Sequence, residues 1–322
     1  MIEVLTNSSL NIVVDQGRLG RLAQGISRGG ALDRLAYELG NIMAGNDSGA
    51  ASIEVNSYPF RLRFDRDCKI AVTGALSFYN VDNVRHVPWS AGVVTAGQTL
   101  TIPYPLSGRS TYIALSGGVD VPRVLGSRTT DIRASFGGFD GKALLRGDHL
   151  HVVCASTEPL DNAGFKAHIS PLLTDFWRSH AQGKTTLRVV PAAQWEEFST
   201  SARAEFTKGQ YAVTNDSNRQ GYRLEGPTLD RVGGGELLSH GILPGTVQVP
   251  RNGQPIIQLV DANTCGGYPK IANVIDADLW KFGQLSPKDK ITFEVVTIED
   301  AVQALKESQA YKSELSRQYP TA

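Results

Sequence analysis

Short apolar segments separated by turn residues run through most of the chain. In several of them apolar and polar positions alternate, and Gly, Pro, Asn or Asp stands at their ends. The clearest cover residues 10–14, 53–55, 60–64, 69–72, 111–115 and 150–153. Strands of four to eight residues give this pattern. It predicts a mainly β fold with a few helices.

One amphipathic helix interrupts the strands of the first half. Its apolar stripe follows the i, i+3, i+4, i+7 spacing of a helix face. The stripe consists of Leu32, Leu35, Ala36, Leu39 and Met43. Gly45 and Asn46 follow it and are candidates for the C-terminal cap. The spacing predicts a helix near residues 31–44.

The length of 322 residues favours two domains. The segment 161–184 is polar, contains proline and lacks a strand pattern, so it is the predicted linker region. The other divisions are an N-terminal mainly β lobe over 1–160, a C-terminal β-barrel lobe over 185–297 and a helical tail over 298–322.

Composition excludes several classes of protein. Thirty-two basic residues balance 32 acidic ones, which argues against a nucleic-acid-binding protein. The chain contains no apolar run of about 18 residues for a membrane helix and no secretory signal at its start. Its three cysteines are far apart and match no zinc spacing, so we expect no metal site and a reducing, cytoplasmic location.

Two segments in the first half combine glycine with arginine. In Ser-Arg-Gly-Gly-Ala-Leu-Asp-Arg, the residues Gly29, Gly30 and Arg34 either form an anion or carbonyl site at a helix N-terminus or simply a turn into the helix. In Leu-Gly-Ser-Arg-Thr-Thr, Arg128 either recognises a carboxylate or phosphate or lies solvated in a surface loop.

A third polar segment reads Asn-Asp-Ser-Asn-Arg-Gln-Gly-Tyr-Arg. Asn215, Arg219 and Arg223 stand on either side of a predicted turn. The segment is either a turn that enters a strand or a loop that presents amide and guanidinium groups to a small anionic ligand. The residues alone favour neither interpretation.

The fourth segment, from 245 to 271, carries the strongest chemical signal. Gln248 and Gln258 stand inside apolar strands, and buried amides need hydrogen-bond partners, which predicts a lined polar cavity. After Asp261 the chain enters a Gly-Gly-Tyr-Pro-Lys turn. Its glycine N–H groups could hold an oxyanion, and Lys270 could act as a cation or a base. The candidate substrate contacts here are Thr264, Gly266, Gly267 and Tyr268.

Two further arrangements have simpler explanations. Cys265 could be a nucleophile with His240 as its base, although a small residue packed beside two glycines is the simpler interpretation. His149 and His151 share one strand face but lack a third metal ligand.

Taken together, these segments resemble the family of the 5-oxoprolinase C subunit, also called the biotin-dependent carboxyltransferase or allophanate hydrolase subunit 2 family. The matching motifs are SRGGALDR at 27–34, SGGVDVPRVLGSRTTDIRASFGGFDGKAL at 116–144, NDSNRQGYRLEGP at 215–227, GTVQVPRNGQPIIQL at 245–259 and GGYPKIANV at 266–274. Two stretches depart from the family pattern. Residues 262–265 read Ala-Asn-Thr-Cys where an arginine is usual, and Leu19 and Arg21 replace proline and tyrosine.

The resemblance implies two β-barrel-like lobes of cyclophilin-like type with a cleft between them. It also implies partner proteins like the A and B subunits of 5-oxoprolinase, ATP used by the complex, and biotin only where a partner supplies it. The joint reaction would open the 5-oxoproline lactam to L-glutamate. Arg128, Arg219 or Arg223 would clamp the substrate carboxylate, while Lys270, Gln248 and Asp261 would act at the amide.

Two other functions stay open at this point. One is a carboxyltransferase that acts on urea or a related amide with carboxybiotin from a partner. The other is a non-catalytic protein that binds a homologue of the B subunit and relieves its inhibition of a kinase.

Overall fold

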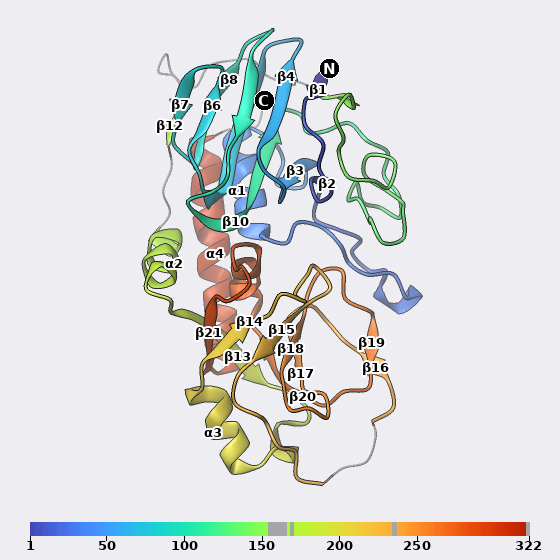
Figure 1. The fold of residues 1–322 in the computed structure, drawn as a ribbon, viewed down its shortest axis with the longest axis vertical. Helices are drawn as coiled ribbons and strands as arrows, with labels where there is room; N and C mark the ends of the chain where they lie inside the picture. The colour runs from blue at the N-terminus through green and yellow to red at the C-terminus, as the bar shows by residue number, and fades with distance from the viewer. Residues whose placement is uncertain (154–165, 168–170, 234–236, 320–322) are drawn as a thin grey trace. The chain divides into compact units, whose positions relative to one another are not determined.

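The computed structural model describes most of the chain as short strands with a few helices, which confirms the mainly β prediction. The described residues are 1–153, 166–167, 171–233 and 237–319. Contacts divide the chain into two compact units (Figure 1). Unit 1 comprises residues 1–19, 29–169 and 310–322, and unit 2 comprises residues 20–28 and 170–309.

Two six-stranded sheets build unit 1. In spatial order the first contains β11 (His149–Leu150), β1 (Ile2–Val4), β4 (Phe60–Phe64), β9 (Thr99–Ile102), β6 (Tyr79–Val81) and β7 (Val84–His86). The second contains β12 (Lys166–Ala167), β8 (Ser90–Val94), β5 (Cys68–Leu76), β10 (Ser107–Leu115), β3 (Ser52–Val55) and β2 (Ile12–Val14). Their pairings are antiparallel, so short hairpins and turns suffice to connect many of the strands.

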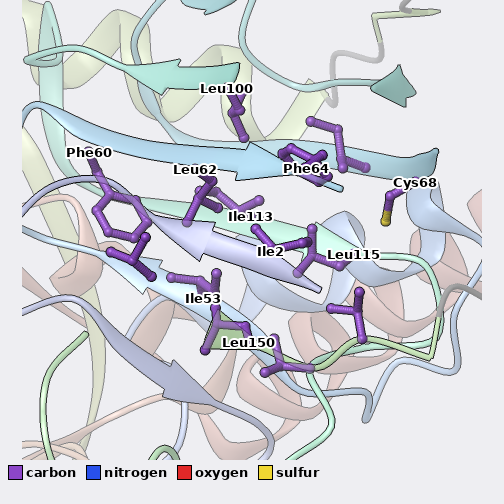
Figure 2. Close-up of a cluster of buried hydrophobic side chains, with 14 of the residues drawn as sticks. Ile2, Ile53, Phe60, Leu62, Phe64, Cys68, Leu100, Ile113, Leu115 and Leu150 are labelled. Carbon is purple, nitrogen blue, oxygen red and sulfur yellow. The ribbon is translucent and has the colours of Figure 1, made fainter. Parts of the chain in front are cut away.

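The main hydrophobic core of unit 1 contains side chains from both sheets. Strand β4 shows how the sequence builds it, because Phe60, Leu62 and Phe64 are buried while Arg61 and Arg63 between them are exposed. This period of two directs alternate side chains to one face. Figure 2 shows these residues meeting Ile2, Ile53, Leu100, Ile113, Leu115 and Leu150.

Helix α1 (Arg34–Ala44) packs on strands β5 and β10. It begins later than the predicted residue 31, because the Asp33 carboxylate accepts a hydrogen bond from the Ala36 N–H at 2.8 Å and caps the first turn. Gly45 ends the helix in the left-handed conformation (φ 80°), which confirms the predicted cap. The Thr73 hydroxyl donates to the Ala36 carbonyl at 2.7 Å and ties the helix to β5.

Unit 2 is built around a closed seven-stranded barrel. Its strands, in order around the barrel, are β13 (Thr185–Pro191), β20 (Lys270–Val274), β17 (Thr246–Gln248), β18 (Ile256–Gln258), β15 (Gly221–Glu225), β14 (Tyr211–Val213) and β21 (Lys290–Val295). Strands β13 and β21 pair in parallel and close the ring. Closure removes the unpaired edges of an open sheet.

The remaining elements are not strands of the barrel. A separate two-stranded sheet pairs β16 (His240–Gly241) with β19 (Cys265–Gly266). The helices are η1 (Leu22–Gln24), α2 (Pro171–Ala181), η2 (Trp195–Glu197), α3 (Thr200–Lys208), η3 (Asp276–Gly283) and α4 (Ile298–Gln318).

The expected linker at 161–184 holds helix α2, although part of that segment lies outside the described residues. The Phe176 ring of α2 packs edge-on against Trp280 of unit 2, with ring centroids 4.8 Å apart. Helix α4 passes from unit 2 into unit 1 at residue 310, and in unit 1 the Lys312 ammonium contacts the Glu38 carboxylate at 2.7 Å.

The buried carboxylate of Asp15 organises the glycine- and arginine-rich loop of unit 1. Oδ1 accepts hydrogen bonds from the Gly17 N–H and from the Ser127 and Thr129 hydroxyls, at 2.5 to 2.8 Å. Oδ2 accepts the Arg128 N–H at 2.5 Å. Four donors from two distant segments therefore meet at one charged group, which holds these segments together.

We predict that Asp15→Asn destabilises the protein by about 2 kcal/mol, because bonds to a charged acceptor are worth more than bonds to a neutral amide. Urea unfolding monitored by circular dichroism measures the change. Asp47→Asn, at an exposed position, is the matched control. Equal stability of the two variants would contradict the role of Asp15.

Candidate functional site

Three adjacent barrel strands carry the polar side chains of the candidate site. Gln248 of β17 is the cross-strand partner of Lys270 in β20, next to a register shift after Val247. Gln258 ends the neighbouring strand β18. Because side chains alternate along a strand, Gln248 points to the face opposite Val247. Two amides and one ammonium thus share one region of the barrel wall.

Lys270 is buried, with 7% of its surface exposed, and its partner lies in the two-stranded sheet of β16 and β19. His240 pairs with Gly266 across β16 and β19, and its Nε2 lies 2.6 Å from Lys270 Nζ. His240 Nδ1 lies 2.9 Å from the Leu238 carbonyl oxygen, which can only accept a hydrogen bond. The network therefore assigns the imidazole proton to Nδ1 and makes Nε2 the acceptor for the Lys270 ammonium.

Two backbone carbonyls complete the surroundings of Lys270. Its ammonium donates to the carbonyl oxygens of Gly266 and Tyr268, each at 3.3 Å. The three acceptors match the three protons of an ammonium group. Burial nevertheless lowers the pKa of Lys270 below its ordinary value, because the charged form loses its hydration.

The two glutamines form a directed pair. Gln258 Nε2 donates to Gln248 Oε1 at 2.9 Å, and Gln248 is only 3% exposed. Gln248 Nε2 is buried and has no hydrogen-bond partner among the described residues. A buried donor without an acceptor is unfavourable, so this group marks a place where a ligand oxygen would be stabilised.

The two glycines of the turn, Gly266 and Gly267, lie so close to neighbouring atoms that a side chain would not fit. A β-carbon at Gly266 would lie 2.8 Å from Gln248 Nε2, and one at Gly267 would lie 2.7 Å from the Leu237 carbonyl oxygen. Both positions therefore need glycine for packing alone. Thr264 directly precedes β19, and its carbonyl accepts a hydrogen bond from the Ile242 N–H at 3.0 Å.

Arg219 and Asp261 bind each other. Arg219 Nε lies 2.8 Å from Asp261 Oδ2 and Arg219 Nη2 lies 3.4 Å from Asp261 Oδ1, so the ion pair is bidentate. The Asp261 N–H also donates to the Arg219 carbonyl at 3.1 Å. The pair links the loop before β15 to the loop after β18.

The exposed side chains of the third segment border a surface hollow. Arg223 lines a hollow of about 700 Å³ together with Asp216, Gln254 and Tyr268. Tyr268 also borders a second hollow of about 1250 Å³. Asn215 is exposed in the same loop. Tyr268, with half of its surface exposed, thus stands beside both hollows.

The remaining candidates belong to unit 1 and make local contacts there. Arg128 Nε donates to the Val121 carbonyl at 2.9 Å, and Arg34 pairs with Glu38 at 2.6 Å one helical turn away. Gly29 and Gly30 adopt positive φ angles of 63° and 90°. A β-carbon at Gly30 would lie 3.0 Å from the backbone of Asp15, so this glycine serves a close approach.

Two residues of the site have roles that the sequence does not indicate. The sequence suggests His240 only as a base for Cys265, whereas the structure brings its Nε2 to Lys270. It marks Gln258 only as a buried amide without a stated role. The alternation of β18 carries a signal for Gln258, but the pairing of residues 240 and 266 is a tertiary contact between segments 26 residues apart.

Among the described residues, no three His, Cys, Asp or Glu side chains gather as metal ligands. Within the same residues no helix is both long and apolar enough to cross a membrane.

The fold and this site define a mainly β protein whose barrel carries buried lysine and amide groups. The chain belongs to the family of the carboxyltransferase domain, subdomain A and B, whose model matches residues 24–295.

Similarity to named proteins covers nearly the whole chain. It is 35% identical to the 5-oxoprolinase C subunit of Escherichia coli over 317 residues, which are 98% of each protein. It is 34% identical to the protein of the same name from Haemophilus influenzae, again over 98% of each.

Solved structures agree on the fold. The crystal structure of the Kluyveromyces lactis urea amidolyase matches 98% of this chain with a TM-score of 0.87 at 25% identity. This chain corresponds to only 20% of that longer protein.

We predict that Lys270 makes the stability of the protein depend on pH. Its folded-state pKa is lowered, so between that value and the unfolded value near 10.5 the unfolded chain binds more protons. Stability contributed by this group therefore rises with pH across that window. Replacement Lys270→Met should flatten the rise, as measured by urea unfolding at a series of pH values.

The exposed Lys208 provides the matched control for loss of one positive charge. If Lys270→Met and Lys208→Met show the same pH dependence of unfolding, the burial argument is wrong.

Proposed function

We propose that this chain is a subunit of an ATP-dependent complex that opens the lactam of 5-oxoproline to L-glutamate. The observation that carries the proposal is the contact of buried Lys270 with His240, beside an unsatisfied amide donor. Identity of 35% to a 5-oxoprolinase C subunit, over 98% of both chains, supports it. The partners would be proteins like the A and B subunits of that enzyme.

The chemical problem is an unreactive amide carbonyl. Addition of water to the carbonyl carbon places negative charge on the carbonyl oxygen, and breaking the ring C–N bond leaves a nitrogen that needs a proton. A positive charge and fixed donors that face the oxygen lower the barrier, most of all where water is excluded. In this proposal Lys270 supplies the charge and Gln248 the donor.

The Lys270–His240 contact also suits proton transfer. The Lys270 ammonium donates to His240 Nε2 at 2.6 Å, and burial lowers the pKa of Lys270. A lysine with a lowered pKa gives up its proton more readily near neutral pH. We therefore assign the pair to protonation of the lactam nitrogen as the ring opens.

Recognition of the substrate carboxylate is assigned to Arg223. Its exposed side chain lines the 700 Å³ hollow with Tyr268, whose carbonyl oxygen accepts a hydrogen bond from Lys270. Arg219 already binds Asp261, so that pair has a positioning role in the proposal. ATP supplies the driving force in the complex, and we route no step of this chain through it.

A carboxyltransferase on urea or a related amide is the second candidate. The similarity to the urea amidolyase structure over 98% of this chain favours it. Carboxybiotin would come from a partner protein, and Lys270 and Gln248 would bind the carboxyl oxygens instead of a lactam oxygen. The two candidates differ in substrate and in the need for a biotinylated partner.

The test is reconstitution of the complex with homologues of the A and B subunits, with 5-oxoproline and urea as alternative substrates. We expect 5-oxoproline-dependent ATP hydrolysis with glutamate formation. Lys270→Met should lower kcat/KM by about 10²-fold, the usual effect of removing one group that stabilises an oxyanion. Lys208→Met should leave turnover unchanged.

Three outcomes would redirect the proposal. Urea turnover that needs a biotinylated partner would establish the carboxyltransferase instead. A stable complex that turns over neither amide would favour the non-catalytic binding protein. Full oxoprolinase activity in Lys270→Met would leave the function in place and move the site elsewhere.

A further inference from the structure

The direction of the Gln248 amide is set by a single hydrogen bond. Gln258 Nε2 donates to Gln248 Oε1 at 2.9 Å, so the Nε2 group of Gln248 has to face the other way. The side chain of Gln248 is buried and its Nε2 has no acceptor among the described residues. An amide that could turn freely would instead expose this donor to water or share it with a neighbour.

A missing side chain lets the chain pack closely against this donor. A β-carbon at Gly266 would lie 2.8 Å from Gln248 Nε2 and 3.5 Å from Oε1, so only glycine fits beside the amide. The Gly266 carbonyl is already bound by the Lys270 ammonium at 3.3 Å. The Gly266 carbonyl is therefore not the acceptor for Gln248 Nε2.

The charge beside this donor is positive. Lys270 is the cross-strand partner of Gln248, and cross-strand neighbours have Cβ atoms only about 5 Å apart. A buried donor without an acceptor, beside an ammonium, suits an oxygen acceptor, and a carbonyl oxygen gaining negative charge suits it best.

We propose that Gln248 Nε2 donates a hydrogen bond to the carbonyl oxygen of an amide or lactam substrate, and that Gln258 is the positioning residue that aims it. The inference rests on the proposed function, which supplies the substrate class. Gln258 itself does not touch the substrate, and its effect passes through Gln248.

The decisive variant is Gln258→Glu, which keeps the shape of the side chain but replaces the donor with an acceptor. Gln248 can then satisfy position 258 only by donating its own Nε2, which turns Oε1 toward Gly266. We expect kcat/KM for 5-oxoproline in the reconstituted complex to fall about 10²-fold. In Gln258→Met, which leaves the Gln248 amide free to rotate, kcat/KM should fall by less.

Three comparisons separate positioning from damage to the fold. Gln303→Glu, on helix α4, adds the same charge at an exposed position and should behave as the unchanged protein. The melting temperature of Gln258→Glu should stay close to that of the unchanged protein. Gly266→Ala should reproduce the loss of kcat/KM, because its methyl group would push Gln248 Nε2 out of place.

A second measurement does not depend on turnover. The side-chain amide resonance of Gln248, assigned by its loss in Gln248→Met, is followed by NMR while the full chain is titrated with the neutral lactam 2-pyrrolidinone. We expect a downfield shift of the amide protons in the unchanged protein and none in Gln258→Glu.

The outcomes distinguish this inference from the proposed function. If the complex is active on 5-oxoproline, a Gln258→Glu enzyme with unchanged kcat/KM overturns the inference. If the complex shows no oxoprolinase activity, the proposed function fails and the titration decides: a shift with the lactam supports the donor role of Gln248, and an unmoved resonance overturns it.

Discussion

Burial of the Lys270 ammonium is the constraint on which the candidate site depends. A buried charge is tolerated only where hydrogen-bond acceptors replace water. Here the acceptors are His240 Nε2 and the carbonyls of Gly266 and Tyr268. To bring them there, the sheet of β16 and β19 has to lie close against the barrel, and Gly266 and Gly267 make that approach possible. The turn, this sheet and the perturbed lysine are thus one structural unit.

Some buried charged residues serve the fold. Asp15 gathers four donors in unit 1. In unit 2, Asp278 is 1% exposed and accepts hydrogen bonds from the Arg188 backbone N–H and guanidinium. Burial alone would raise the pKa of the Asp278 carboxyl, and these donors together with Lys281 hold it below its ordinary value. A polar motif therefore indicates either a site or a structural brace, and only the contacts separate the two.

The overall charge balance does not show where each charge lies. Equal numbers of acidic and basic residues argue against a strongly basic protein, but a net charge of zero does not describe any single face. In the structure several arginines are paired locally, as Arg219 is with Asp261 and Arg34 with Glu38. Lys270 differs because the described groups that accept its hydrogen bonds are an imidazole nitrogen and two carbonyl oxygens rather than a carboxylate.

The sequence alone predicted the mainly β class and the helix that ends at Gly45. Those features depend on local periodicity and capping, which neighbouring residues determine. It also singled out Gln248, because a polar residue inside an apolar strand is conspicuous, and Lys270, because it follows a Gly-Gly-Tyr-Pro turn. The meeting of His240 with Lys270 and of Gln258 with Gln248 was decided only by the tertiary structure. Both depend on strand register, and register is determined when the barrel closes and pairs distant segments.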